Sequence, residues 1–148
     1  MKKNKTETIT NMQKSKVSAD ELTKTVKEKS LALGAHLVGI LSMSRMDSAP
    51  PELHPRRYLP KAEYLVSIGF RINQGVQQLH LRGESPMPFS RFAGLEPKFR
   101  LDDAALDLAN FLEDLGYITL PVPANQYYYT QVGKGEISHK HVAMAAGI

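Results

Sequence analysis

The sequence predicts a single domain of the α/β (α+β) class, in which helices pack on a small mixed sheet in three layers. The chain of 148 residues is long enough for one ordinary core. Its composition, 42% hydrophobic and 23% charged, is that of a globular protein. Amphipathic helical segments alternate along the chain with short apolar segments of strand character. We expect this domain to span residues 18–148.

Residues 1–17 are polar and lack hydrophobic periodicity, which predicts a disordered basic tail. Five Lys and one Glu lie there and account for the whole net charge of +4, so the remaining residues carry no net charge. Nucleic-acid binding is therefore not expected of this chain alone. No hydrophobic stretch follows the basic start, and no apolar run approaches the roughly 20 residues of a membrane span. The expected location is the cytoplasm, without membrane contact.

The first helix is predicted from its two ends. Ser18 and Glu21 have the spacing of a capping box, in which each side chain bonds a free backbone N–H at the start of a helix. Gly34 stands where a helix favours a residue in the left-handed conformation. Apolar residues recur on one face between these ends. We therefore expect a helix from about Ala19 to Leu33.

Two buried strands are expected next, at residues 36–41 and 64–72, because both are short apolar runs rich in branched and aromatic side chains. Three prolines between them predict a loop over residues 43–59. A short helix is expected over Gln74–Leu81. The Pro-, Gly- and Phe-rich stretch Gly83–Pro97 is interpreted as a long loop.

In the second half, a helix is expected to begin at a cap formed by Asp102 or Asp103 and to close at Gly116. A third strand is expected over residues 117–122. Ser138 is expected to cap a last helix that runs toward the C-terminus.

Cysteine is absent from the chain, so it holds no disulfide, no thiol nucleophile and no cysteine-ligated zinc or iron–sulfur cluster. His139 and His141 are the closest pair of potential ligands. Side chains two positions apart on a helix point about 200° from each other, so one metal ion shared by this pair is not expected. A single histidine of the two facing a cofactor is the better interpretation.

Four segments carry a family resemblance. They are Ala32–Ile40, Pro60–Gly69, Leu108–Tyr117 and Ile137–Ile148. In this order they resemble the N-terminal region of tRNA epoxyqueuosine reductases and of their relatives, the corrinoid reductive dehalogenases. The likeness covers about residues 19–148.

The resemblance implies a cobalamin-binding domain related in fold to flavin nitroreductases, followed by a ferredoxin-like module with two iron–sulfur clusters that pass electrons to cobalt. Ala143, Ala146 and Gly147 match a family segment, A-x-x-A-G-L-G, that lies beside the cofactor. With His139 they are the expected cofactor-binding residues. Glu96 falls near the place of the aspartate in the family's Asp-Tyr-His triplet, which this chain lacks, and it is the candidate catalytic carboxylate.

The chain ends within that segment and carries no cysteine-bearing module. We therefore expect an incomplete N-terminal part of an iron–sulfur and cobalamin-dependent oxidoreductase, a partial nitroreductase-like domain from a truncated gene or a split protein. It would contribute part of a cofactor pocket and hold no iron–sulfur cluster itself. It would need a cysteine-rich iron–sulfur partner chain or self-association. The alternatives are a non-catalytic binding or assembly module that retains the fold, and a small nitroreductase-like protein that binds FMN.

Overall fold

The computed structural model of the chain describes residues 18–84, 86–124 and 137–148. The expected basic tail, residues 1–17, lies outside the described residues. The helices and strands, in chain order, are α1 (Ala19–Ala32), β1 (Leu37–Ser42), β2 (Tyr64–Gly69), α2 (Gln74–Leu81), α3 (Pro86–Phe89), α4 (Glu96–Asp114) and α5 (His139–Ala146). Short 3₁₀ turns and one π-helical turn complete them: η1 (Met43–Met46), η2 (Pro51–Leu53), η3 (Pro55–Arg57) and η4 (Ser90–Leu95).

Strands β1 and β2 form a two-stranded antiparallel ribbon, in which Leu37 lies opposite Gly69 and Ser42 lies opposite Tyr64. The fold is therefore α+β. The mixed sheet that the sequence predicts is wrong for the described residues, whose sheet has these two strands. The expected loop between them is instead three 3₁₀ turns, η1 to η3, joined by short connections.

The third expected strand, residues 117–122, is not formed. This segment is bonded to α4 instead: the Thr119 hydroxyl donates to the carbonyl of Ala109 over 3.2 Å, and the backbone N–H of Ala124 donates to Asp102 over 2.6 Å. Pro121 and Pro123 have no backbone N–H to offer to a strand ladder. This proline-interrupted segment is thus bonded to α4 and does not extend the ribbon.

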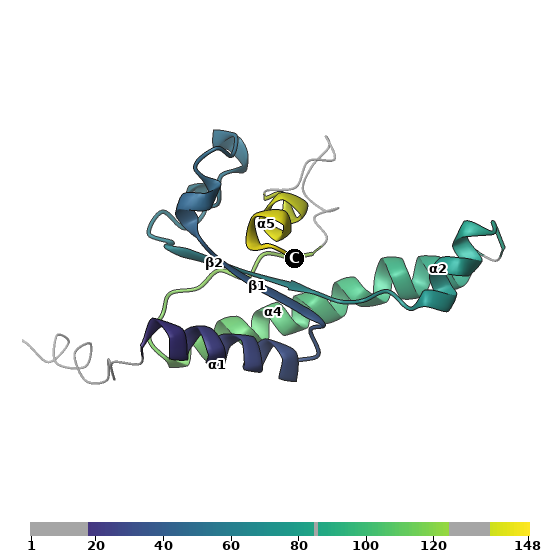
Figure 1. The fold of residues 1–148 in the computed structure, drawn as a ribbon, viewed down its shortest axis with the longest axis horizontal. Helices are drawn as coiled ribbons and strands as arrows, with labels where there is room; N and C mark the ends of the chain where they lie inside the picture. The colour runs from purple at the N-terminus through teal and green to yellow at the C-terminus, as the bar shows by residue number, and fades with distance from the viewer. Residues whose placement is uncertain (1–17, 85, 125–136) are drawn as a thin grey trace, which may run out of the picture.

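The ribbon is covered on both sides (Figure 1). Helices α1 and α4 lie on one side and contact β1 and β2 respectively, while α5 lies on the other side and contacts both strands. This gives three layers with the ribbon in the middle. A two-stranded ribbon is at best marginally stable alone, so both helical layers are needed to bury its faces.

Helix α1 begins where the sequence predicts, because the Ser18 hydroxyl accepts a hydrogen bond from the N–H of Glu21 over 3.1 Å. It ends before Gly34, whose φ of 96° is left-handed. Val26 and Ser30 are buried, and the hydroxyl of Ser30 donates to the carbonyl of Val26 over 2.7 Å, which satisfies it. The buried side chains that α4 contributes are Ala104, Leu108 and Ala109.

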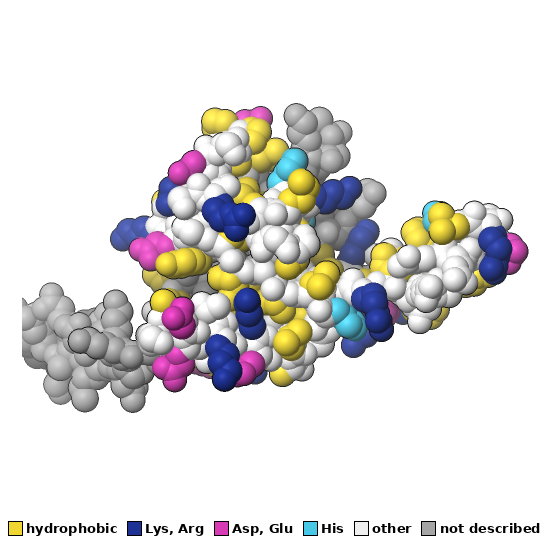
Figure 2. Space-filling view, in the orientation of Figure 1, with side chains coloured by type: hydrophobic (Ala, Val, Ile, Leu, Met, Phe, Trp, Pro, Cys, Tyr) yellow, Lys and Arg dark blue, Asp and Glu magenta, His cyan; other side chains and the backbone are white. Residues whose placement is uncertain are grey.

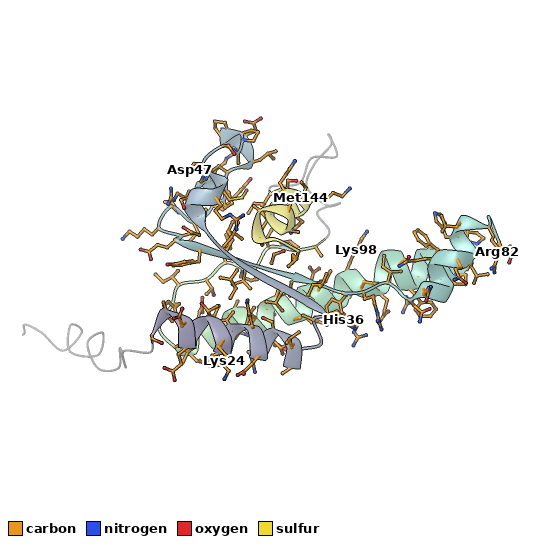
Figure 3. The ribbon with its side chains drawn as sticks, viewed as in Figure 1. Lys24, His36, Asp47, Arg82, Lys98 and Met144 are labelled. Atoms are coloured by element: carbon orange, nitrogen blue, oxygen red, sulfur yellow. The ribbon has the colours of Figure 1, made fainter. Side chains whose placement is uncertain are left out.

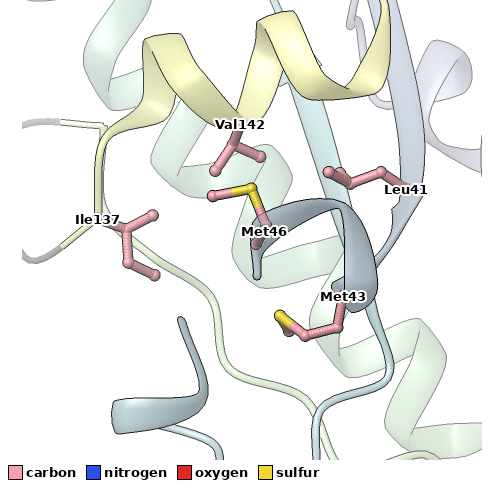
Figure 4. Close-up of a cluster of buried hydrophobic side chains, with 5 residues drawn as sticks. All are labelled: Leu41, Met43, Met46, Ile137 and Val142. Atoms are coloured by element: carbon pink, nitrogen blue, oxygen red, sulfur yellow. The ribbon is translucent and has the colours of Figure 1, made fainter. Parts of the chain in front are cut away.

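A cluster of buried hydrophobic side chains lies on the α5 side of the ribbon (Figure 4). It joins elements far apart in sequence, and its buried members are Leu41, Met43, Met46, Ile137 and Val142. Met43 has no exposed surface. Methionine suits such an irregular junction of a strand end, a turn and a helix, because its unbranched side chain adapts to the space available.

Helices α2 and α3, the turn η4 and the start of α4 contact one another and project from the body as an arm (Figure 1). Helix α2 has the expected bounds. The expected loop Gly83–Pro97 is wrong, because residues 86–95 are helical and run without a break into α4. Pro97 is the second residue of α4, directly after the change from the π-helical pattern of η4 to the α-helical pattern.

The expected start of this long helix at Asp102 or Asp103 is consequently also wrong, because α4 begins at Glu96. Asp102 bonds to a neighbouring segment instead of capping the helix. Among the described residues from 71 to 103, none is buried, and hydrophobic side chains are visible on the surface of the arm (Figure 2).

Within the described part of the chain, the helices are too short or too polar to cross a membrane.

The core of Figure 4 generates a stability prediction. Met43→Ala should lower the free energy of unfolding by about 2–5 kcal/mol, because it leaves a cavity where a fully buried side chain was. Met144→Ala is the matched control: this side chain is 73% exposed, and the expected change is within about 0.5 kcal/mol. Urea unfolding followed by circular dichroism measures both. Equal losses in the two variants would contradict the assignment of the core.

Candidate functional site

Four of the five residues that the resemblance selects lie along α5: His139 begins the helix, Ala143 and Ala146 lie within it, and Gly147 follows it. The helix ends at Gly147, whose φ of 82° is left-handed. The N–H of Ile148 donates to the carbonyl of Ala143 over 3.1 Å, which satisfies a free carbonyl of the last turn. At the other end Ser138 makes no capping bond through its side chain, contrary to expectation, because its hydroxyl bonds to His141 Nδ1 over 2.7 Å.

The approach of α5 to β1 is unusually close. A Cβ placed on Gly39 would lie 2.6 Å from the Cβ of Ala146 and 3.4 Å from a methyl carbon of Ile148. Only glycine on the strand and a small residue on the helix permit this distance. Ala146 therefore packs against the ribbon and not against an open surface.

His139 is exposed, but its ring bonds to another segment of the chain. Its Nε2 lies 3.0 Å from the carbonyl oxygen of Pro123. Since a carbonyl oxygen only accepts, this nitrogen carries the proton in that hydrogen bond. His139 thus ties α5 to the segment that follows α4. His139 and His141 bond to different groups, as their spacing predicts. The described residues contain no group of three or more His, Cys, Asp or Glu side chains placed to hold a metal ion.

The remaining two residues differ in exposure. Ala143 is half-buried and Gly147 is exposed, and a Cβ added to Gly147 would meet no atom within 4 Å. Residues four apart lie on one side of a helix, so these two positions form one surface. Exposed Lys140 and Met144 flank it (Figure 3 labels Met144). This side of α5 thus combines two small residues, Ala143 and Gly147, with the exposed side chains of Lys140 and Met144.

Glu96 is not brought to this surface. It is the first residue of α4, in the arm, and its carboxylate pairs with the guanidinium of Arg91 over 3.1 Å. Helices α4 and α5 cover opposite sides of the ribbon (Figure 1). Of the five candidates, Ala143 and Gly147 share an open surface, His139 and Ala146 hold the helix that carries it, and Glu96 lies apart.

Sequence reasoning missed Gly39, which fixes the position of α5. The signal was present, since an isolated glycine inside a strand pattern often marks a close approach of another backbone. Comparisons with protein-family models, with curated proteins and with solved structures found no significant match to this chain.

The close contact between β1 and α5 is testable with a pair of glycine variants. Gly39→Ala should lower the free energy of unfolding by about 1–3 kcal/mol, because the added methyl group overlaps Ala146 and must displace α5. Gly69→Ala, in the paired strand, is the control. Its Cβ would lie 3.4 Å from that of Leu37, so we expect a loss below about 1 kcal/mol. Denaturant unfolding compares the two. A Gly39→Ala protein as stable as the wild type would show that α5 is not seated as described.

Proposed function

We propose that this chain forms one wall of a cobalamin-binding pocket in a cytoplasmic reductase similar to the epoxyqueuosine reductases, with a partial nitroreductase-like fold. The observation that carries the proposal is the pair of small residues, Ala143 and Gly147, on one side of the C-terminal half of α5, with open space beside Gly147. These two residues belong to the segment through which the chain resembles that family.

The geometry suits a large planar ring for a steric reason. A ring lies closely against a helix only where no branched side chain stands between them, and the open side of α5 meets this condition at Ala143 and Gly147. The wall is also held rigidly. Ala146 is seated against Gly39, and His139 is bonded to Pro123. Rigid placement of such a surface reduces the ordering needed when a ligand binds.

The chemistry of the reaction would come from the bound group: cobalamin supplies a cobalt centre that transfers electrons to a substrate. This chain's part is to orient the ring. Iron–sulfur clusters require thiolate ligands, and the chain has no cysteine. In this proposal a cysteine-rich partner chain supplies them and the other wall of the pocket.

A second candidate function, a non-catalytic assembly module, is favoured by a different observation. The arm formed by α2, α3, η4 and the start of α4 has no buried side chain among its described residues. Helices as short as α2 are marginal in water unless they are packed against another surface. An arm of this kind suits attachment to another protein better than it suits catalysis.

The cofactor proposal predicts weak but localised binding, because a single wall buries only part of the ligand. We expect hydroxocobalamin to bind with a dissociation constant on the order of 100 µM or weaker. In heteronuclear NMR spectra, the amide signals of Ala143 and Gly147 should shift most. Ala143→Phe should weaken binding at least about tenfold, since the new ring occupies the surface. Leu31→Phe, on the exposed part of α1, is the matched control and should bind as the wild type does.

The same titration with FMN separates the two cofactors. Saturable shifts of the α5 amide signals with FMN, and none with hydroxocobalamin, would show that the ligand of this wall is a flavin and not a corrin. Shifts confined to other elements, or no shifts with either ligand at millimolar concentration, would refute α5 as a cofactor wall.

A further inference from the structure

We propose that the outer edge of β1 binds an extended segment of a partner protein, which adds to the ribbon as a third strand. This binding does not depend on the cofactor proposal. It rests on the hydrogen-bonding groups along that edge and on the width of the helical layer beneath the ribbon.

The outer edge of β1 carries backbone groups that the described residues leave unpaired. The N–H of Met43 donates to the carbonyl of Glu63 over 2.8 Å, and β1 and β2 pair in regular register from there. In an antiparallel ribbon, successive residues direct their N–H and C=O groups alternately toward and away from the other strand. The odd-numbered residues of β1 therefore bond to β2, while Val38 and Ile40 direct their groups outward. The sheet of the described residues has no strand on that side.

The chemistry of this edge selects an extended peptide. A row of alternating N–H and C=O groups is matched by the backbone of another extended chain, whose own groups recur with the same spacing. Folded proteins usually protect a free edge with a charged side chain, a proline or a bulge. Residues 36–44 contain no Lys, Arg, Asp, Glu or proline, and the register over Leu37–Ser42 has no bulge. The edge is therefore suited to pairing and not protected against it.

The helical layer under the ribbon is wider than the ribbon. Packed helices lie about 8 to 10 Å apart and neighbouring strands about 4.8 Å apart, so two helices span about twice the width of two strands. Helix α1 contacts β1, and α4 contacts β2. Each helix therefore extends beyond the outer edge of the strand that it covers. A third strand beside β1 would find α1 already beneath it.

The side of α1 that extends past β1 exposes an apolar side chain. The ammonium group of Lys29 lies 5.3 Å from the centre of the Phe111 ring, which identifies the side of α1 that faces α4. Leu31 lies about 200° around the helix from Lys29, away from α4, and is 53% exposed. On the α5 side of the ribbon, which Gly39 shares, Leu37 is 54% exposed. An added strand would cover both leucines, which requires uncharged side chains with apolar groups on its two faces.

The outer edge of β2 is less open than that of β1. The segment after α4 bonds to Asp102 and Ala109, which lie about 160° to 180° around α4 from Phe111. This places the segment on the side of α4 away from α1, where α4 extends past β2. The main contacts of β1 are with β2, with α1 and α5 on its two sides, and with the turn η1 that follows it (Figure 1). None of these described elements covers its outer edge.

A second copy of this chain does not fit the same edge. Two copies paired antiparallel through β1, about a two-fold axis, would bring their α1 helices to the same side of a four-stranded sheet. Each α1 already extends past its own β1, so the two helices would need the same space. A single extended segment brings no helix to that side and avoids this overlap.

Amide hydrogen exchange followed by NMR tests whether the edge is open. In the free chain, the amides of Val38 and Ile40 should exchange at least about tenfold faster than those of Gly39 and Leu41, which bond to β2. Equal protection of the four amides would overturn the proposal, because the edge would already be covered by this chain or by a second copy.

A synthetic heptapeptide, with alternating valine and threonine between two terminal lysines and both ends blocked, is the binding probe. We expect a Kd below about 1 mM and slower exchange at Val38 and Ile40. The same peptide N-methylated on its central residues keeps the side chains but has no central N–H to donate, and it should not bind. The proposal would be overturned by equal binding of the two peptides, by binding confined to β2 or the helices, or by no binding at 1 mM.

Two proline variants distinguish the edges of the ribbon. Val38→Pro removes an outward N–H of β1 and none of its bonds to β2, so peptide binding should weaken at least about tenfold. Val66→Pro makes the same change on the outer edge of β2 and is the control, which should bind as the wild type does. Leu31→Lys leaves the strand intact and serves if Val38→Pro does not fold. It should weaken binding about threefold or more. Wild-type affinity in both Val38→Pro and Leu31→Lys would contradict strand addition at β1, as would an equal loss in a folded Val66→Pro protein.

Discussion

A ribbon of two strands has two faces to bury and no neighbouring strand to help, and this constraint organises the described structure. Each face requires its own helical layer. On one side α1 and α4 provide it, with Val26 and Leu108 among their buried side chains. On the other side α5 provides this layer, and Gly39 allows α5 to approach β1 closely. The position of the candidate site at the end of α5 is therefore a consequence of how the ribbon is covered.

Local signals predicted those parts of the fold that are decided locally. The cap at Ser18 and the left-handed Gly34 delimit α1 through their own hydrogen bonds and backbone angles. Helix α2 was predicted with its actual bounds. The helical structure of the rest of the arm was not predicted, because proline and glycine at residues 83–97 indicate a loop. In the structure Pro97 is the second residue of α4 and follows the π-helical turn η4 directly.

The other differences arise from contacts between distant residues. Residues 117–122 have strand character, but Thr119 bonds to Ala109 of α4, and Ala124, just after the segment, bonds to Asp102. Contacts between distant residues also separate the residues of the predicted site from one another. The pattern in the sequence selects His139, Ala143, Ala146 and Gly147 together, but the packing of α5 seats Ala146 against β1 and bonds the exposed His139 to the carbonyl of Pro123. A linear motif does not reveal which side of its helix will be buried, because the elements that bury it lie about a hundred residues away.

Helices α4 and α5 cover opposite sides of the ribbon, so a molecule bound on α4 would leave the α5 wall open. An assembly that instead buried α5 would compete with a cofactor for the same surface. The two helices also differ in what holds them. Helix α5 is fixed by contacts with β1 and with the segment after α4, whereas the arm end of α4 has only its own short helices around it. Order in the arm therefore depends on a partner in a way that order in α5 does not.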